Sequence, residues 1–328
     1  MRRVAAVLLA AGLLFAGPAA AADRPFLAYL ASWYEPPAAR PADTLIARLP
    51  GYVGILALGF ARPDMIYPEG GELSGSGLQF PFAAPFLREA IATLKKRNPR
   101  TRVVVSVGGA NYGRWDRYDA AALARLVRDI GADGVDLDYE PSDPGCAAAA
   151  GRVACRSDAT WAALVARTRA ALPRPLLLTV PGWSVGAYGE GAWAAARPPS
   201  PWTGSMLALL RAPEAAAIDL VSIMGYDAGP AFDPVEAFRA YRHHWRGPLA
   251  VGVQVLPSEV AGSPRFTPAY AGRLLDQVTR DPLAGAMLYG LRLTPPGAVG
   301  ADNPDAAILA ATICRGLGAR GCERPLPP

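Results

Sequence analysis

Three acidic residues alternate with apolar residues in the stretch "DGVDLDYE", residues 133–140. In a β-strand, Asp136, Asp138 and Glu140 would share one face at a spacing of about 6–7 Å. Carboxylates this close in a low dielectric cannot all ionise cheaply, so some must share protons or have a raised pKa. A protonated Glu can act as a general acid, and an ionised Asp beside it can stabilise positive charge. The stretch therefore predicts acid–base chemistry centred on Glu140.

Two other interpretations fit this stretch less well. A solvent-facing edge strand would not carry such apolar neighbours, and no cluster of Lys or Arg accompanies the acids. A calcium-binding loop of the D-x-D-x-D-G type would need a glycine at its sixth position, which "DLDYEP" lacks. Asp133 has the opposite strand parity and is expected to anchor the start of the strand.

Eight short apolar runs recur along the chain, each followed by a segment with helical spacing. The expected strands are residues 26–33, 52–60, 102–109, 134–140, 175–183, 218–227, 248–257 and 284–291. The expected helices are roughly residues 41–49, 84–97, 118–130, 158–172, 204–214, 234–245, 268–280 and 303–316. Near-continuous apolar runs are typical of buried parallel strands.

Eight β-then-α units predict an α/β fold, a single (β/α)8 TIM barrel. Glu140 would then lie at the C-terminal mouth, where barrel active sites are built. A doubly wound open sheet is the alternative, but no G-x-G-x-x-G follows the first strand.

The N-terminus has the pattern of a secretory signal peptide. Arg2 and Arg3 precede an apolar run over residues 4–16 and the small-residue stretch "GPAAAAD". An uncleaved membrane anchor is the alternative, although the run is short for a spanning helix. We therefore expect a signal peptide at residues 1–22, a catalytic domain at 23–318 and a Pro-rich tail at 319–328. The mature protein would be secreted or periplasmic, with no membrane association.

The charge and cysteine content indicate which ligands and cross-links to expect. The formal net charge of +5 includes Arg2 and Arg3, so the chain without residues 1–22 carries +3. Its basic residues are dispersed, which argues against nucleic-acid binding. Four cysteines in an exported protein are typical of two disulfides. The short-loop pairing is Cys146–Cys155 with Cys314–Cys322, and the sequence leaves all three pairings open. No C-x-x-C occurs and the only histidines are adjacent, so no metal site is expected.

The acidic stretch resembles the D-x-x-D-x-D-x-E signature of glycoside hydrolase family 18, the chitinases and their relatives. Two further motifs support this resemblance: "SVGG" at residues 106–109 is similar to the family's S-x-G-G, and "MGYD" at residues 224–227 is similar to its M-x-Y-D. The order and spacing of the strands extend the resemblance over nearly the whole mature chain.

The resemblance implies a retaining, substrate-assisted hydrolysis of β-1,4-linked N-acetylglucosamine polymers, without a cofactor. Glu140 would protonate the glycosidic oxygen and later activate water. Asp138 would orient the acetamido nitrogen, and Asp136 would share a proton with Asp138. Tyr226 would donate a hydrogen bond to the acetamido carbonyl, and Asp227 would bind the sugar at the cleavage subsite.

The remaining candidates surround this centre. Ser106 and Tyr29 would support Asp136 from neighbouring strands, although Tyr29 also fits a core position. The substrate-binding candidates are Asp227, Tyr289, Tyr29, Ser106, Trp33, Trp183 and Met224, with Trp202, Trp115 and Trp245 as further candidates for stacking on sugar rings. Tyr289 is a departure, because family members commonly carry a Trp at this position on strand eight. A phenol offers a smaller stacking face.

Several functions remain open at this level. The expected partner is an N-acetylglucosamine-containing polysaccharide or oligosaccharide, bound by a monomer. Only one helix fits between strands seven and eight, which favours an open groove and endo action. The alternatives are an endo-β-N-acetylglucosaminidase acting on glycoproteins, a peptidoglycan-directed N-acetylglucosaminidase, and a non-catalytic sugar-binding protein on the same barrel.

Overall fold

The structure is a computed structural model that describes residues 24–258 and 260–327. The signal peptide expected at residues 1–22 lies outside the described residues. Within them, no helix combines the length and the apolar character needed to cross a membrane.

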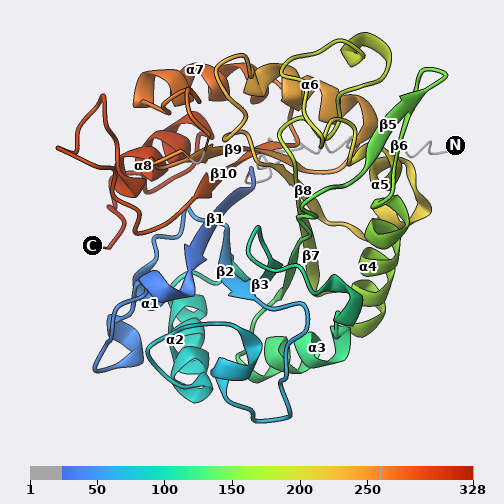
Figure 1. Cartoon of the computed structure of the whole chain (residues 1–328). Coiled ribbons are helices and arrows are strands. Elements are labelled where there is room, and N and C mark those ends of the chain that lie inside the picture. Colours follow the sequence, from blue (N-terminus) through green and yellow to red (C-terminus); the bar gives the residue numbers. More distant parts are fainter. Residues whose placement is uncertain (1–23, 259, 328) are drawn as a thin grey trace, which may run out of the picture.

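Eight parallel strands close into a barrel, which confirms the predicted (β/α)8 fold (Figure 1). Around the barrel the strands follow the order β1, β10, β9, β8, β7, β4, β3 and β2. Their bounds are β1 Phe26–Ala31, β2 Ile55–Ala61, β3 Arg102–Gly108, β4 Gly134–Asp138, β7 Leu177–Gly182, β8 Leu220–Ile223, β9 Leu249–Gln254 and β10 Ala284–Tyr289. The acidic strand β4 therefore lies between β3 and β7.

The α-helices form a ring outside the strands (Figure 1). They are α1 Leu45–Arg48, α2 Ala84–Arg97, α3 Ala120–Asp129, α4 Asp158–Ala171, α5 Leu207–Arg211, α6 Pro234–His244, α7 Pro268–Val278 and α8 Ala306–Gly316. Two expected helices are shorter than predicted. The segment at 41–49 is a 3-10 turn, Pro41–Asp43, followed by α1. The segment at 204–214 gives α5 and then a second 3-10 turn at Pro213–Ala217, because a residue before proline is held in an extended conformation.

The alternation in β4 separates the barrel interior from the helix layer. Val135, Leu137 and Tyr139 are buried in the large outer core between strands and helices. The Tyr139 ring makes edge contacts with Trp115 and Trp161, each with ring centroids 5.1 Å apart. The acidic side chains therefore occupy the opposite, inward face, as the sequence predicts.

A hairpin that the sequence did not predict follows the acidic strand. Strands β5 (Cys146–Ala149) and β6 (Arg152–Cys155) pair antiparallel and project from the barrel (Figure 1). Ala150 and Gly151 both have positive φ, which matches the two-residue turn that suits a tight hairpin. The stretch "CAAAAGRVAC" carries little of the β-branched or aromatic content that marks strands, so its pattern gave no signal.

Both disulfides follow the short-loop pairing. Cys146 bonds Cys155 across the hairpin, and Cys314 in α8 bonds Cys322 in the C-terminal tail. Leu326 in the same tail is buried against the core. The Pro-rich tail is thus held to the barrel at two points.

Candidate active site

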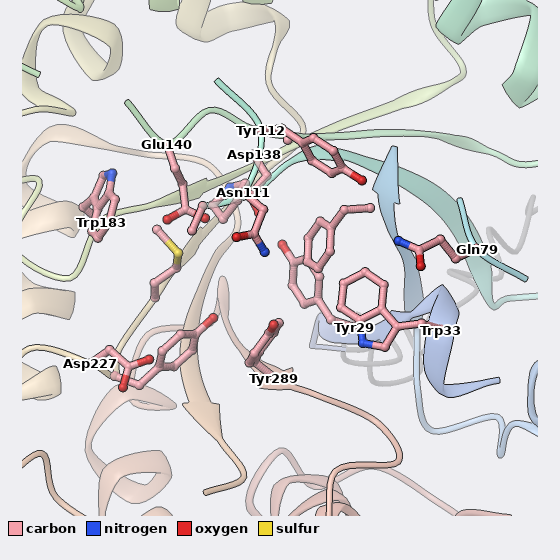
Figure 2. Close-up of a pocket in the computed structure, with 17 residues that line it drawn as sticks. Tyr29, Trp33, Gln79, Asn111, Tyr112, Asp138, Glu140, Trp183, Asp227 and Tyr289 are labelled. Carbon is pink, nitrogen blue, oxygen red and sulfur yellow. The ribbon is translucent and has the colours of Figure 1, made fainter. Parts of the chain in front are cut away.

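A cavity of about 410 Å³ opens at the C-terminal ends of the barrel strands (Figure 2). Nine of the eleven candidate site residues line it: Tyr29, Trp33, Asp138, Glu140, Trp183, Met224, Tyr226, Asp227 and Tyr289. The other two, Asp136 and Ser106, are fully buried. The nine lining residues come from five different strand ends or the loops after them and converge on one space, as the barrel predicts.

Asp136 is enclosed by three hydroxyl groups. Tyr29 Oη and Ser106 Oγ each donate to its Oδ2 at 2.8 Å, and Thr179 Oγ1 donates to its Oδ1 at 2.5 Å. Burial raises the pKa of Asp136, while these hydrogen bonds act in the opposite direction by favouring the charged form. Tyr29 and Ser106 lie where the sequence led us to expect them. Thr179 was missed, although it is the β7 residue in register with Asp136.

Asp138 is the acid with the most perturbed surroundings. Burial raises its pKa well above the ordinary value, and the charges of Glu140 and Asp136 and a hydrogen bond with Glu140 raise it further. Its Oδ1 is buried and has no hydrogen-bond partner within the described part of the chain. Asp138 is thus suited to keep a proton to a higher pH than an exposed aspartate does, and to bind a polar group that enters the cavity.

The two glycines of "SVGG" permit the close contact between β3 and β4. Gly108 has a φ of +110°, and a Cβ there would lie 2.0 Å from the Asp138 carbonyl oxygen. The Gly109 amide donates to that same carbonyl at 2.9 Å. Any side chain at position 108 would therefore push the acidic strand away from β3. Glu140 lies two residues beyond the end of β4, and Figure 2 shows its carboxyl group directed into the cavity.

The "MGYD" motif lies directly after β8 and supplies the wall opposite Trp33 and Gln79 (Figure 2). Burial raises the pKa of Tyr226 well above its usual range, with further contributions from Tyr289 and the carboxylates. Asp227 has a φ of +50°, and its Oδ1 accepts hydrogen bonds from Gln254 Nε2 at 2.8 Å and from the Ser258 hydroxyl. Sequence reasoning missed both of these partners, because they belong to another strand and its loop.

Aromatic rings form two sides of the cavity. Tyr289 stacks on Tyr226, and Trp183 stacks on Trp202 with ring centroids 4.5 Å apart and 26° between planes. Trp33 is 41% exposed at the rim. The other stacking candidates do not line the cavity. Trp115 and Trp245 are buried in the core, so their prediction as sugar-stacking residues is wrong.

Several lining residues were not predicted. They are Phe60, Gln79, Gly108, Gly109, Ala110, Asn111, Tyr112 and Pro181. Ala110, Asn111 and Tyr112 directly follow "SVGG", so their place after a strand end was a usable signal. Gln79 lies in the long β2–α2 connection, where no periodic sequence pattern indicates which way a side chain points. The described residues contain no group of three or more His, Cys, Asp or Glu side chains arranged to hold a metal ion.

Solved structures share this architecture. A family 18 chitinase from Pseudoalteromonas aurantia has a TM-score of 0.59 at 18% identity, covering 81% of this chain and 94% of that chain. YKL-39, solved in the presence of chitooligosaccharides (GlcNAc4), has a TM-score of 0.59 at 11% identity, covering 90% of this chain and 100% of that chain. A chitinase-like agglutinin from Robinia pseudoacacia has a TM-score of 0.57 at 15% identity, covering 89% and 99%.

No protein-family model matches the chain, and no curated protein matches it. At the identities of the solved structures, the similarity establishes the fold alone. That fold is shared by family 18 chitinases and by chitinase-like proteins, as the three sequence motifs led us to expect.

Proposed function

We propose that this chain is an exported glycosidase that hydrolyses β-1,4-linked N-acetylglucosamine polymers, with Glu140 as its general acid and base. The observation that carries the proposal is the row of Asp136, Asp138 and Glu140 on the inward face at β4. The first is buried among three hydroxyls, the second has a strongly raised pKa, and the third faces the cavity. Because their surroundings differ this much, the three carboxyl groups should bind protons with different affinities and so take different roles in proton transfer.

In the first step, Glu140 donates its proton to the glycosidic oxygen, and the bond from that oxygen to the anomeric carbon breaks. The carbonyl oxygen of the substrate's own N-acetyl group attacks the anomeric carbon and forms a cyclic oxazolinium ion. The carboxyl group of Asp138 accepts a hydrogen bond from the acetamido N–H and stabilises this cation. Its unpartnered buried Oδ1 supports that role.

In the second step, the ionised Glu140 removes a proton from water, which attacks the anomeric carbon and opens the ring intermediate with net retention. The Tyr226 hydroxyl holds the acetamido carbonyl. Its strongly raised pKa keeps it protonated as a donor. Asp227, fixed by Gln254 and Ser258, binds a sugar hydroxyl at the same subsite.

The surroundings of the cavity support a chain-like substrate. A second cavity of about 670 Å³ adjoins the first, since Gln79 and Tyr112 line both. It lies along the β2–α2 connection and is lined by Phe80 and Phe82 among others. Among the described residues between β9 and β10, α7 is the one α-helix, and they form no inserted domain that would raise that wall. An open groove of this kind accommodates internal segments of a polymer, which favours endo action.

A non-catalytic sugar-binding function is the second candidate. Tyr289 in place of a larger ring favours it, and an agglutinin shares the fold. Among enzymes, glycoprotein glycans and peptidoglycan are the alternative substrates for the same acids. The two disulfides support export to an oxidising compartment. We propose that the protein acts there as a monomer.

The deciding experiment is hydrolysis of fluorogenic N-acetylglucosamine di- and trisaccharides by the mature protein, beside Glu140→Gln. We expect release by the wild type and a loss of about 10²–10⁴-fold in the variant, which is the usual contribution of a general acid. Peptidoglycan and a glycoprotein are assayed in parallel. If all substrates stay intact while oligosaccharides still bind, the enzyme proposal is wrong and the sugar-binding function replaces it.

A further inference from the structure

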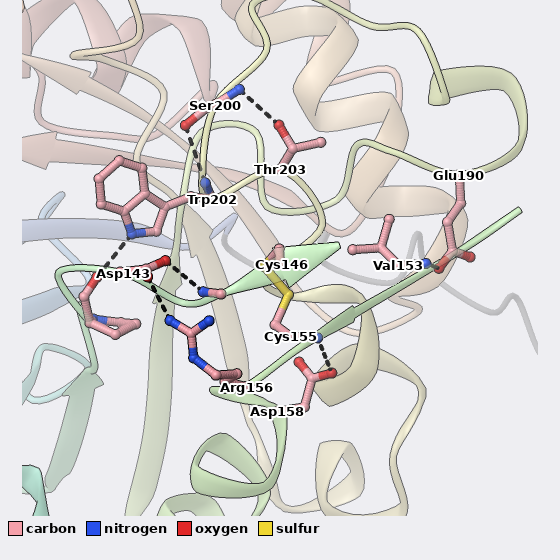
Figure 3. The surroundings of a disulfide bond; sticks show 12 residues. Asp143, Cys146, Val153, Cys155, Arg156, Asp158, Glu190, Ser200, Trp202 and Thr203 are labelled. Carbon is pink, nitrogen blue, oxygen red and sulfur yellow. Dashed lines mark hydrogen bonds and ion pairs between the residues drawn. A yellow bond between two sulfur atoms is a disulfide. The ribbon is translucent and has the colours of Figure 1, made fainter. Parts of the chain in front are cut away.

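A single indole joins the segment that carries Glu140 to the aromatic wall of the cavity. Trp202 Nε1 donates a hydrogen bond to the Pro141 carbonyl oxygen at 3.0 Å (Figure 3). The face of the same ring stacks on Trp183, which lines the cavity. Trp202 itself does not line the cavity. It therefore contacts the residue after Glu140 on one side and a substrate-facing ring on the other.

The backbone on both sides of Glu140 is held by identified contacts. The strand β4 ends at Asp138, so Glu140 lies beyond the ladder of strand hydrogen bonds. On the N-terminal side, the Gly109 amide holds the Asp138 carbonyl at 2.9 Å. On the C-terminal side, Pro141 has no amide hydrogen and restricts Glu140 to extended conformations. The carbonyl of Pro141, the residue that follows Glu140, is held by the Trp202 indole.

The β5–β6 hairpin keeps the segment of Trp202 in place. The Val153 amide in β6 donates to Glu190 Oε1 at 2.7 Å, and Glu190 is paired with Arg211 at 2.6 Å. The Val153 side chain also packs closely on Gly204, where a Cβ would lie 2.5 Å from Val153 Cγ1 and φ is +85°. Gly204 is two residues from Trp202. The hairpin closed by the Cys146–Cys155 disulfide thus packs against the segment that carries Trp202, whose indole holds the Pro141 carbonyl (Figure 3).

We propose that Trp202 is a positioning residue, which fixes the backbone beyond Glu140 and the orientation of Trp183 together. This inference rests on the proposed function, because it assigns the purpose of the anchor to proton transfer by Glu140. A general acid must lie within hydrogen-bond reach of the oxygen that it protonates. A displacement of about 1 Å can lower a rate by about 10²-fold. The bond to Pro141 serves the chemical step, and the stack on Trp183 serves substrate binding.

Two substitutions separate these contributions. Trp202→Phe keeps an aromatic face for Trp183 but removes the N–H donor, so we expect kcat to fall about tenfold or more with KM within twofold. Trp202→Leu removes both contacts, so KM should rise as well. Trp193→Phe is the matched control, because this indole lies in the neighbouring 3-10 turn against His243 and does not line the cavity. An unchanged kcat in Trp202→Phe would overturn the proposal.

Hydrogen–deuterium exchange tests the anchor without relying on activity. The peptide covering residues 138–145 should exchange faster in Trp202→Phe than in the wild type or in Trp193→Phe. Exchange at the same rate in all three proteins would overturn the anchor. If the wild type cleaved no substrate, the proposed function would fail, and the exchange comparison would still decide whether Trp202 holds this segment.

Discussion

The rings of Tyr226 and Tyr289 stack across the cavity, with centroids 5.8 Å apart and 25° between their planes. The two residues lie after β8 and at the end of β10, on strands separated by β9. One of them is the proposed acetamide donor, and the other is proposed to take the place of the larger ring that the resemblance to family 18 implies. Under the proposed function, the floor beneath the reacting sugar would be built from two phenols that pack against each other.

Replacing Tyr289 by a smaller or by a larger side chain should change substrate binding in opposite directions. We expect Tyr289→Ala to raise KM for the trisaccharide about three- to tenfold, because aromatic contacts contribute about 0.5–1.5 kcal/mol. Tyr289→Trp should lower KM while kcat stays within twofold. Steady-state kinetics on the same substrate measures both variants. A Trp variant that binds no better than the Ala variant would show that Tyr289 does not form the floor.

Thr179 should matter for catalysis although it is buried below the cavity. Thr179→Val removes the 2.5 Å hydrogen bond to Asp136, which lets the pKa of that carboxyl rise further. We expect a loss of about 1–3 kcal/mol in the free energy of unfolding and about tenfold or more in kcat. Thr168→Val is the control, since it removes a buried hydroxyl from α4 that bonds Tyr118 and the Leu164 carbonyl. Equal effects of both variants on kcat would contradict this role.

The ionisable side chain of Asp138 should lower the free energy of unfolding at neutral pH. An unfolded aspartate titrates near pH ~3.9, whereas burial and nearby carboxylates hold the folded pKa of Asp138 well above that value. Between these two values the folded state keeps a proton that the unfolded state has lost, so the free energy of unfolding falls as pH rises.

Asp138→Asn removes this dependence. We expect it to raise the free energy of unfolding at pH 7 by about 1 kcal/mol or more, because a tenfold change in proton affinity corresponds to about 1.4 kcal/mol. The gain should vanish near pH 4, while activity is lost at both. Urea unfolding at the two pH values checks this prediction, and a gain of equal size at pH 4 would contradict it.

The second cavity predicts a dependence on substrate length. Phe82→Leu should raise KM for the hexasaccharide several-fold and leave the disaccharide unchanged, because only a long chain can reach from Asp138 past Gln79. Phe86→Leu is a matched control, since its ring stacks on Phe82 at 4.7 Å but lines neither cavity. The same change in KM for both substrate lengths would assign Phe82 a structural role only.

The two disulfides offer an internal comparison, because they close loops of similar length at 9 and 8 residues of separation. Replacing either pair by serine should cost about 2–3 kcal/mol of stability by the loop-entropy estimate. Only the loss of Cys146–Cys155 should also lower kcat, because that hairpin clamps the segment of Trp202. Thermal unfolding and kcat below the transition measure the two effects. A similar fall in kcat for the Cys314–Cys322 variant would rule out a specific role for the hairpin.

The sequence predicted well those features that show as a regular spacing of apolar and polar residues along a short stretch of chain. Asp136 and Asp138 alternate with apolar residues, so their common face followed from strand geometry alone, whereas Glu140, expected in the same strand, lies two residues beyond its end. The eight apolar runs likewise predicted the barrel. The strand ends were less well placed: β8 ends at Ile223, before the Tyr226 that was expected within it.

The features that the sequence did not predict depend on register between distant segments. Thr179 reaches Asp136 only because β7 pairs with β4 in one particular register. Gln254 and Ser258 reach Asp227 from the end of β9 and its loop. The hairpin depends on a cross-strand disulfide whose pairing the spacing left open. No local pattern carries this information.

The aromatic layer behind β4 also separates two pairs among the seven tryptophans by their surroundings. Trp115 and Trp161 contact Tyr139 on the outer face of the acidic strand, away from solvent. Trp33 and Trp183 line the cavity. Sugar binding should therefore alter the fluorescence of the second pair and leave the first unchanged. Emission from Trp115 and Trp161 would instead follow the integrity of the barrel wall, so one unlabelled sample can report on ligand occupancy and on unfolding separately.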